Sequence, residues 1–164
     1  VGGGCGPGDQ PFVDSQREKL RRAGLAADAT FHPNLSREEK IAFYASCDVL
    51  SVPARSSEAF GLYVIEALAA GTPLVQPPDA TFPELLAATG GGVLATANTP
   101  AALAQALEPL LLDPARLRRL GDAGQAAVRA RFTDETMARA VAATTRSVLA
   151  GTRATSPARP AGPG

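Results

Sequence analysis

The feature that most constrains this chain is an alternation of short apolar runs with longer helical patterns that carry recognisable caps. The apolar runs are rich in Val, Leu and Phe, and strands are predicted at residues 29–31, 48–53, 73–76 and 90–94. Strands that alternate with helices are typical of a parallel sheet with helices on its faces. We therefore expect an α/β fold with a Rossmann-like parallel sheet and flanking helices.

Capping residues and glycines predict where the helices begin and end. A first helix is expected from Asp14, a good N-cap, to Gly24, a C-terminal signal. Ser36 and Glu39 have the spacing of a capping box, which predicts a second helix up to Cys47. A helix is predicted at residues 61–70, and another at 81–88, which begins with a second capping box of Thr81 and Glu84. Two more helices are predicted to begin at Thr99-Pro100 and at Asp113-Pro114. The last is predicted from Thr133 or Asp134 to Gly151.

The two ends of the sequence differ in character from the middle. Val1 is not an initiator methionine and is followed at once by three glycines, which is typical of a strand that ends in a loop. We therefore expect residues 1–150 to be a partial Rossmann-like domain, truncated at its N-terminus and lacking its central strand. Residues 151–164 have almost no apolar side chains to bury, which predicts a disordered tail rich in Pro, Ala and Gly.

Charge and composition exclude several classes of function. Sixteen basic residues balance sixteen acidic ones, so there is no global positive field to hold a nucleic acid. No apolar run reaches the roughly 20 residues that span a bilayer, which favours a cytoplasmic location. The spacing of Cys5, His32 and Cys47 along the sequence does not match that of a metal site, so no metal is expected.

Glu66 is the residue that is hardest to explain by structure alone. The helix predicted at residues 61–70 is apolar nearly all round, and such helices are usually buried. A buried carboxylate is costly unless hydrogen bonds compensate it. Two interpretations stay open: Glu66 points to solvent or pairs with an arginine, or it accepts hydrogen bonds from the hydroxyls of a ligand.

The start of the same helix has features of an anion site. It follows a predicted strand and the polar loop 55–60, which places its first N–H groups at the carboxyl edge of the sheet, where parallel sheets bind ligands. Gly61 would let the backbone approach a phosphate closely. Any doubly wound domain contains several such turns, so this pattern alone does not identify a ligand.

A longer set of motifs is far more specific. Glu58 and Glu66 are separated by seven residues that include Phe-Gly, and the run Glu-Ala-Leu-Ala-Ala-Gly-Thr-Pro follows from Glu66. Phe82-Pro-Glu84 comes after them and Phe31-His-Pro-Asn34 before them. In this order the motifs resemble those of the retaining GT-B glycosyltransferases of the family 4 kind. The similarity covers about residues 1–150, and the fold that it implies is the C-terminal, nucleotide-sugar-binding half of a GT-B enzyme.

The resemblance implies transfer of a sugar from a nucleotide-diphosphate donor to a sugar, lipid or small-molecule acceptor, with retention of anomeric configuration. Glu58 would face the donor sugar as the catalytic residue, and Glu66 would hold the ribose hydroxyls. The other expected donor contacts are the amides of Phe60, Gly61 and Leu62 at sugar or diphosphate oxygens, Gly3 and Gly4 near the nucleotide, and Phe31 and His32 beside the base. No cofactor or metal is implied beyond the donor itself.

The resemblance also implies what this chain lacks. The family's diphosphate-clamping Arg and Lys, the acceptor site and any membrane contact would belong to a preceding N-terminal half, so this fragment alone is expected to be inactive. Two alternatives stay open. One is a nucleotide-sugar epimerase of the same architecture, and the other is a non-catalytic nucleotide-sugar-binding module.

Overall fold

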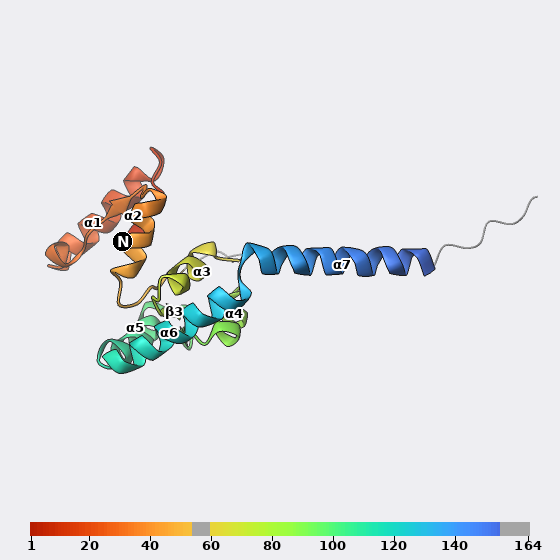
Figure 1. Ribbon diagram of the computed structural model, residues 1–164. Coiled ribbons are helices and arrows are strands. Elements are labelled where there is room, and N and C mark those ends of the chain that lie inside the picture. Colours follow the sequence, from red (N-terminus) through yellow and green to blue (C-terminus); the bar gives the residue numbers. More distant parts are fainter. Residues whose placement is uncertain (54–59, 155–164) are drawn as a thin grey trace, which may run out of the picture.

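The computed structural model describes residues 1–53 and 60–154, and the side chains among them up to residue 150 (Figure 1). Glu58 and the tail 155–164 lie outside these residues. Helices alternate with short parallel strands, which confirms the α/β class. The elements are β1 (Gly2–Gly3), α1 (Gln10–Arg22), a 3-10 turn (Ala26–Asp28), β2 (His32–Pro33), α2 (Arg37–Ala45), α3 (Leu62–Ala69), β3 (Leu74–Gln76), α4 (Phe82–Thr89), β4 (Gly92–Leu94), α5 (Pro100–Leu111), α6 (Pro114–Arg131) and α7 (Asp134–Ala154).

The strands of the described residues form two separate parallel pairs. β1 pairs with β2 and β3 pairs with β4, with Gly2 opposite His32 and Val75 opposite Val93. The strand predicted at 48–53 is reduced to a single bridge, in which Leu50 donates its N–H to the Pro73 carbonyl and accepts from the Val75 N–H, both at 2.9 Å. The next N–H along the strand, that of Val52, donates to the Gln76 side chain at 3.1 Å instead of to a backbone carbonyl, so the ladder does not continue.

A cavity of about 530 Å³ lies between the two pairs. Gly2, Gly3 and Gly4 line it from β1, and Leu50 and Val52 line it from the side of β3. The two parallel pairs do not join across this cavity. β1 and the segment at Leu50 therefore face each other across the cavity.

The buried core lies between residues 44 and 128. One cluster joins α3, β3 and α4 with Tyr44 and Val128, and a second joins Val75 to α5 and α6. α6 approaches the rest of the core at glycines: a Cβ on Gly124 would lie 2.5 Å from Leu68 Cδ2 and 2.9 Å from Gly91 Cα. By contrast, α1 has no buried residue, and its Phe12 is 67% exposed.

Two predicted boundaries near the N-terminus are wrong. α1 begins at Gln10 rather than at Asp14, because Pro11 in the first turn has the fixed backbone angle that starts a helix and Val13 already donates its N–H to the Asp9 carbonyl. The strand predicted at 29–31 lies at His32–Pro33, where the backbone meets β1. The predicted stop at Gly24 agrees with the structure, since its φ of 73° is left-handed.

Most of the predicted caps are confirmed. The capping box of Ser36 and Glu39 is complete, and the Thr99 and Asp113 side chains cap α5 and α6. Thr133 caps α7 by accepting from the Thr136 N–H at 3.1 Å. The second capping box is wrong: Thr81 Oγ1 makes no cap bond and instead donates to the Phe60 carbonyl at 3.1 Å.

The last helix, α7, projects away from α4 and α6 (Figure 1). It ends at Ala154, three residues beyond the predicted Gly151. Large apolar side chains on it, such as Met137 and Val141, are exposed. Nowhere in the described part of the chain is a helix both long and apolar enough to cross a membrane.

Candidate functional site

Glu66 lies in the middle of α3, and its carboxylate is held at both oxygens. Lys40 Nζ donates to Oε1 at 2.7 Å, and the Tyr44 hydroxyl donates to Oε2 at 3.1 Å. The Glu66 side chain is 40% exposed, so it is less buried than the apolar character of α3 predicts. The ion pair that one interpretation of Glu66 expected is present, although the partner is a lysine rather than an arginine.

Both partners of Glu66 come from α2. Lys40 and Tyr44 are four residues apart and therefore lie on one face of that helix, which packs against α3. Burial, and next the negative charge of Glu66, raise the pKa of Tyr44 to about 12. The Tyr44 hydroxyl thus keeps its proton and remains a donor to the carboxylate.

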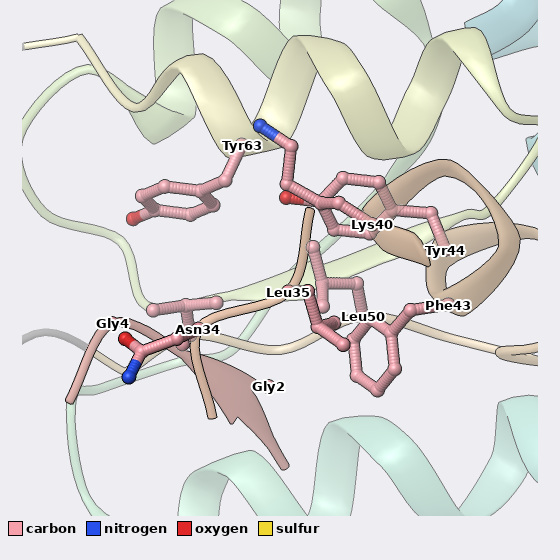
Figure 2. A pocket seen from close by; sticks show the side chains of 11 residues that line it. Gly2, Gly4, Asn34, Leu35, Lys40, Phe43, Tyr44, Leu50 and Tyr63 are labelled. Atoms are coloured by element: carbon pink, nitrogen blue, oxygen red, sulfur yellow. The ribbon is translucent and has the colours of Figure 1, made fainter. Parts of the chain in front are cut away.

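The cavity between the strand pairs adjoins these side chains. Figure 2 shows Lys40, Tyr44 and Tyr63 on the α3 side, with Gly4 and Asn34 across from Tyr63. The predicted nucleotide contacts Gly3 and Gly4 both line this cavity.

Asn34 fixes the glycine-rich loop that borders this cavity. Its φ of 54° turns the chain after β2. Its side chain accepts from the Cys5 N–H at 2.8 Å and donates to the Cys5 carbonyl at 2.9 Å. These two hydrogen bonds therefore fix the backbone next to Gly4 at the edge of the cavity.

Phe31 and His32 lie around a second cavity, of about 600 Å³, which also includes Gly3 and Gly4. The Arg17 guanidinium lies 5.0 Å from the centre of the Phe31 ring. His32 is part of β2 rather than of a loop, and its ring lies 5.7 Å from that of Phe43. The structure thus brings Phe31 and His32 to the glycines but not to Glu66.

Phe60, Gly61 and Leu62 form the start of α3, as predicted. Gly61 has a φ of 74° at the N-cap, and Phe60 and Leu62 are exposed at 45% and 68%. Because Thr81 donates to the Phe60 carbonyl, the N-termini of α3 and α4 are tied together. Two helix dipoles therefore present their positive ends to one region, a setting that favours an anion.

Sequence reasoning missed Lys40 and Tyr44, and it named Asn34 only as part of the Phe31-His-Pro-Asn34 motif. A signal for Lys40 was present, since the chain has fourteen arginines and only two lysines, and this lysine precedes a tyrosine at helical spacing. Glu58 lies outside the described residues, so the structure does not place it. Within the described ranges, no group of three or more His, Cys, Asp or Glu residues could hold a metal ion.

Comparison with known proteins identifies relatives. The family profile "Glycosyl transferases group 1" matches residues 3–127. A D-inositol 3-phosphate glycosyltransferase of Segniliparus rotundus is 34% identical over 151 residues, which are 92% of this chain and 33% of the relative. The chain thus spans about a third of that relative's length.

Solved structures share the fold. Sucrose-phosphate synthase from Thermosynechococcus elongatus superposes with a TM-score of 0.77 at 29% identity, over 92% of this chain and 38% of that one. Anabaena Alr3699/HepE in complex with UDP and glucose has a TM-score of 0.79 at 24% identity, over 89% and 39%. The match to transferases does not favour the epimerase alternative. The chain belongs to the group 1 family of glycosyltransferases and has the α/β fold of a part of a GT-B enzyme.

Proposed function

We propose that residues 1–150 form the donor-binding domain of a retaining GT-B glycosyltransferase of the family 4 kind, in which Glu66 accepts hydrogen bonds from the ribose hydroxyls of a nucleotide-diphosphate sugar. The observation that carries this proposal is the carboxylate of Glu66, which Lys40 and Tyr44 orient from the rim of a cavity bordered by Gly3 and Gly4. A carboxylate with lone pairs to spare is a good acceptor for a pair of hydroxyls.

The paired N-termini of α3 and α4 support a diphosphate in the same donor. In the proposed reaction the bond from the anomeric carbon to the diphosphate oxygen breaks, a bond to an acceptor oxygen forms, and the proton of the acceptor hydroxyl passes to the leaving diphosphate. The leaving diphosphate gains negative charge, which backbone N–H groups at helix N-termini stabilise without a metal ion. Glu58 faces the donor sugar in this proposal. UDP is the first nucleotide to test, since the Anabaena neighbour was solved with UDP and glucose.

Calorimetry of UDP and GDP binding to a chain of the relatives' full length tests the ribose assignment. We expect Glu66→Ala to weaken binding of the preferred nucleotide by roughly 1–3 kcal/mol, because charge-assisted hydrogen bonds are lost. Glu108→Ala, which removes an exposed carboxylate on α5, is the matched control and leaves affinity unchanged. One series contains EDTA and a second contains Mg²⁺ without EDTA, and the affinity should be the same in both.

Equal affinity of wild type and Glu66→Ala would remove the ribose assignment, and binding that requires Mg²⁺ would contradict the metal-free proposal. Failure of the chain to bind either nucleotide would contradict a donor site made by these residues. Retention is tested separately in a chain of the relatives' full length, by NMR of the anomeric centre of the product.

A further inference from the structure

The carboxylate of Glu66 is fixed in a particular way by α2. One donor from that helix reaches each oxygen, Lys40 at Oε1 and Tyr44 at Oε2. A carboxylate has about four lone-pair sites, two on each oxygen, so one site on each oxygen stays available. These two sites lie on neighbouring oxygens, which suits two adjacent hydroxyls of one sugar.

The ion pair contributes little to stability in this position. The Lys40 and Glu66 side chains are 39% and 40% exposed. Ion pairs so open to water add little to folding, and α2 is also held to α3 by the buried ring of Tyr44. Lys40 can therefore be changed without loss of the fold, and its effect on a ligand can be measured separately.

It matters that the cation beside Glu66 is a lysine and not an arginine. An ammonium is a compact charge that binds one carboxylate oxygen here, whereas a guanidinium tends to take both oxygens in a planar fork. A fork would occupy sites that the hydroxyls need. The chain uses arginine in fourteen of its sixteen basic positions, yet a lysine stands at this one.

We propose that Lys40 is a positioning residue for ribose selection: its ammonium holds the Glu66 carboxylate in the orientation that accepts both hydroxyls of a ribose, and so favours ribonucleotides over 2′-deoxyribonucleotides. This inference rests on the proposed function of Glu66. Lys40 acts through Glu66, which distinguishes it from a lysine that attracts phosphates directly. The orientation exists before the ligand arrives, so less ordering is needed on binding.

The test, in a chain of the relatives' full length, compares the dissociation constants of UDP and 2′-deoxy-UDP, with GDP and 2′-deoxy-GDP as a second pair. Wild type should prefer the ribonucleotide by about tenfold, the effect of one lost hydrogen bond to a charged group. Lys40→Met should reduce this preference to about threefold or less, mainly by weakening the binding of the ribonucleotide. Lys40→Gln is a second, more polar variant, and Lys40→Arg should also lose preference although it keeps the charge.

Two controls separate positioning from general charge effects. Arg37→Met removes a positive charge from an exposed position on the same helix and should leave the preference unchanged. In a Glu66→Gln background, Lys40→Met should cause no further loss. Circular dichroism and thermal melts of each variant show whether it folds like wild type.

The outcomes distinguish the inference from the function on which it rests. Equal weakening of both nucleotides by Lys40→Met, or an unchanged preference in folded Lys40 variants, overturns the role of Lys40 while Glu66 keeps its own. A wild type without any preference, or one that Glu66→Gln does not alter, overturns the ribose assignment of Glu66 first, and the role of Lys40 with it.

Discussion

At the scale of single residues, the environment of Tyr44 makes a measurable prediction about pH. The chain has two tyrosines, and burial together with the Glu66 charge raises the pKa of Tyr44 from 10.0 to about 12. The neutral phenol is thus favoured in the folded state, and its contribution to stability is complete below pH 10 and is lost as the pH rises to about 12. A titration of phenolate absorbance should show the ionisation of Tyr44 near pH 12.

Variants assign that ionisation. Tyr44→Phe should remove the late step, and Tyr63→Phe should retain it. Glu66→Gln should move it to lower pH, because the negative neighbour is gone while burial remains. If Tyr44→Phe leaves the absorbance change near pH 12 at its wild-type size, the environment described for this hydroxyl is wrong.

The sequence allowed Glu66 to be singled out, but not its partners. A carboxylate among apolar neighbours is visible in the local pattern, since it contradicts the expected burial of the helix. Lys40 and Tyr44 lie 26 and 22 residues earlier, and only the packing of α2 on α3 brings them to it. Local periodicity contains no information about which of several helices will be adjacent.

At the scale of elements, the N-terminal cap of α2 is open to a direct test. Ser36→Ala removes the hydroxyl that accepts from the Glu39 N–H at 3.2 Å, and should lower the free energy of unfolding by about 1 kcal/mol. Ser36→Asp restores an acceptor and should recover most of the loss. Urea unfolding measures both, and a loss in Ser36→Asp as large as in Ser36→Ala would contradict the capping role.

A helix cap was predictable from the sequence where its hydrogen bond depends only on neighbouring residues. It was not predictable where a distant segment takes the hydrogen bond of the capping side chain. Thr99 and Asp113 each precede a proline at the first helical position, so neighbouring residues alone determine their bonds. Thr81 had the same kind of signal, but its hydroxyl turns to the carbonyl of Phe60, 21 residues earlier. The strand predicted at 48–53 is a single bridge at Leu50 for a similar reason: the length of a strand depends on neighbouring segments as well as on its own residues.

At the scale of the whole molecule, stability is distributed unevenly. Both core clusters lie in residues 44–128, whereas β1, α1 and β2 contain no buried residue. We expect amide hydrogen exchange to be slowest in α3, β3 and α6 and much faster in α1. The thermal transition of the isolated chain should be broad, and the open strand edges should favour aggregation.

The thermal transition and the hydrogen exchange of residues 1–164 are compared with those of a chain extended by a strand, a helix and a strand before residue 1. If the two strand pairs lack a shared neighbour, the extended chain should melt in one sharp transition and protect α1 as well as α3. Equal protection of α1 and α3 in residues 1–164 alone, together with a sharp melt, would show that the two pairs already form one cooperative unit.

The α/β class and two strand pairs around a gap were predictable from alternation and from the order of strands in doubly wound sheets. The direction of α7 was not, because its capping signals give a start and a length but no packing partner. Its side chains up to residue 150 are almost all exposed, so nothing in its pattern determines an angle to the rest of the chain.

The close approach of α6 to the core has a consequence for how this sequence can vary. Gly124 and Gly91 meet backbone to backbone, and a Cβ on Gly121 would collide with the carbonyl oxygen of Gly71. Alanine, the smallest possible change, is already too large at these sites, whereas Gly3 and Gly4 have open space around them. Saturation mutagenesis scored by protein abundance should therefore find no accepted substitution at the three interior glycines and broad tolerance at the two beside the cavity. Glycines that shape the core and glycines that border a ligand would be distinguished by abundance alone, before any activity is known.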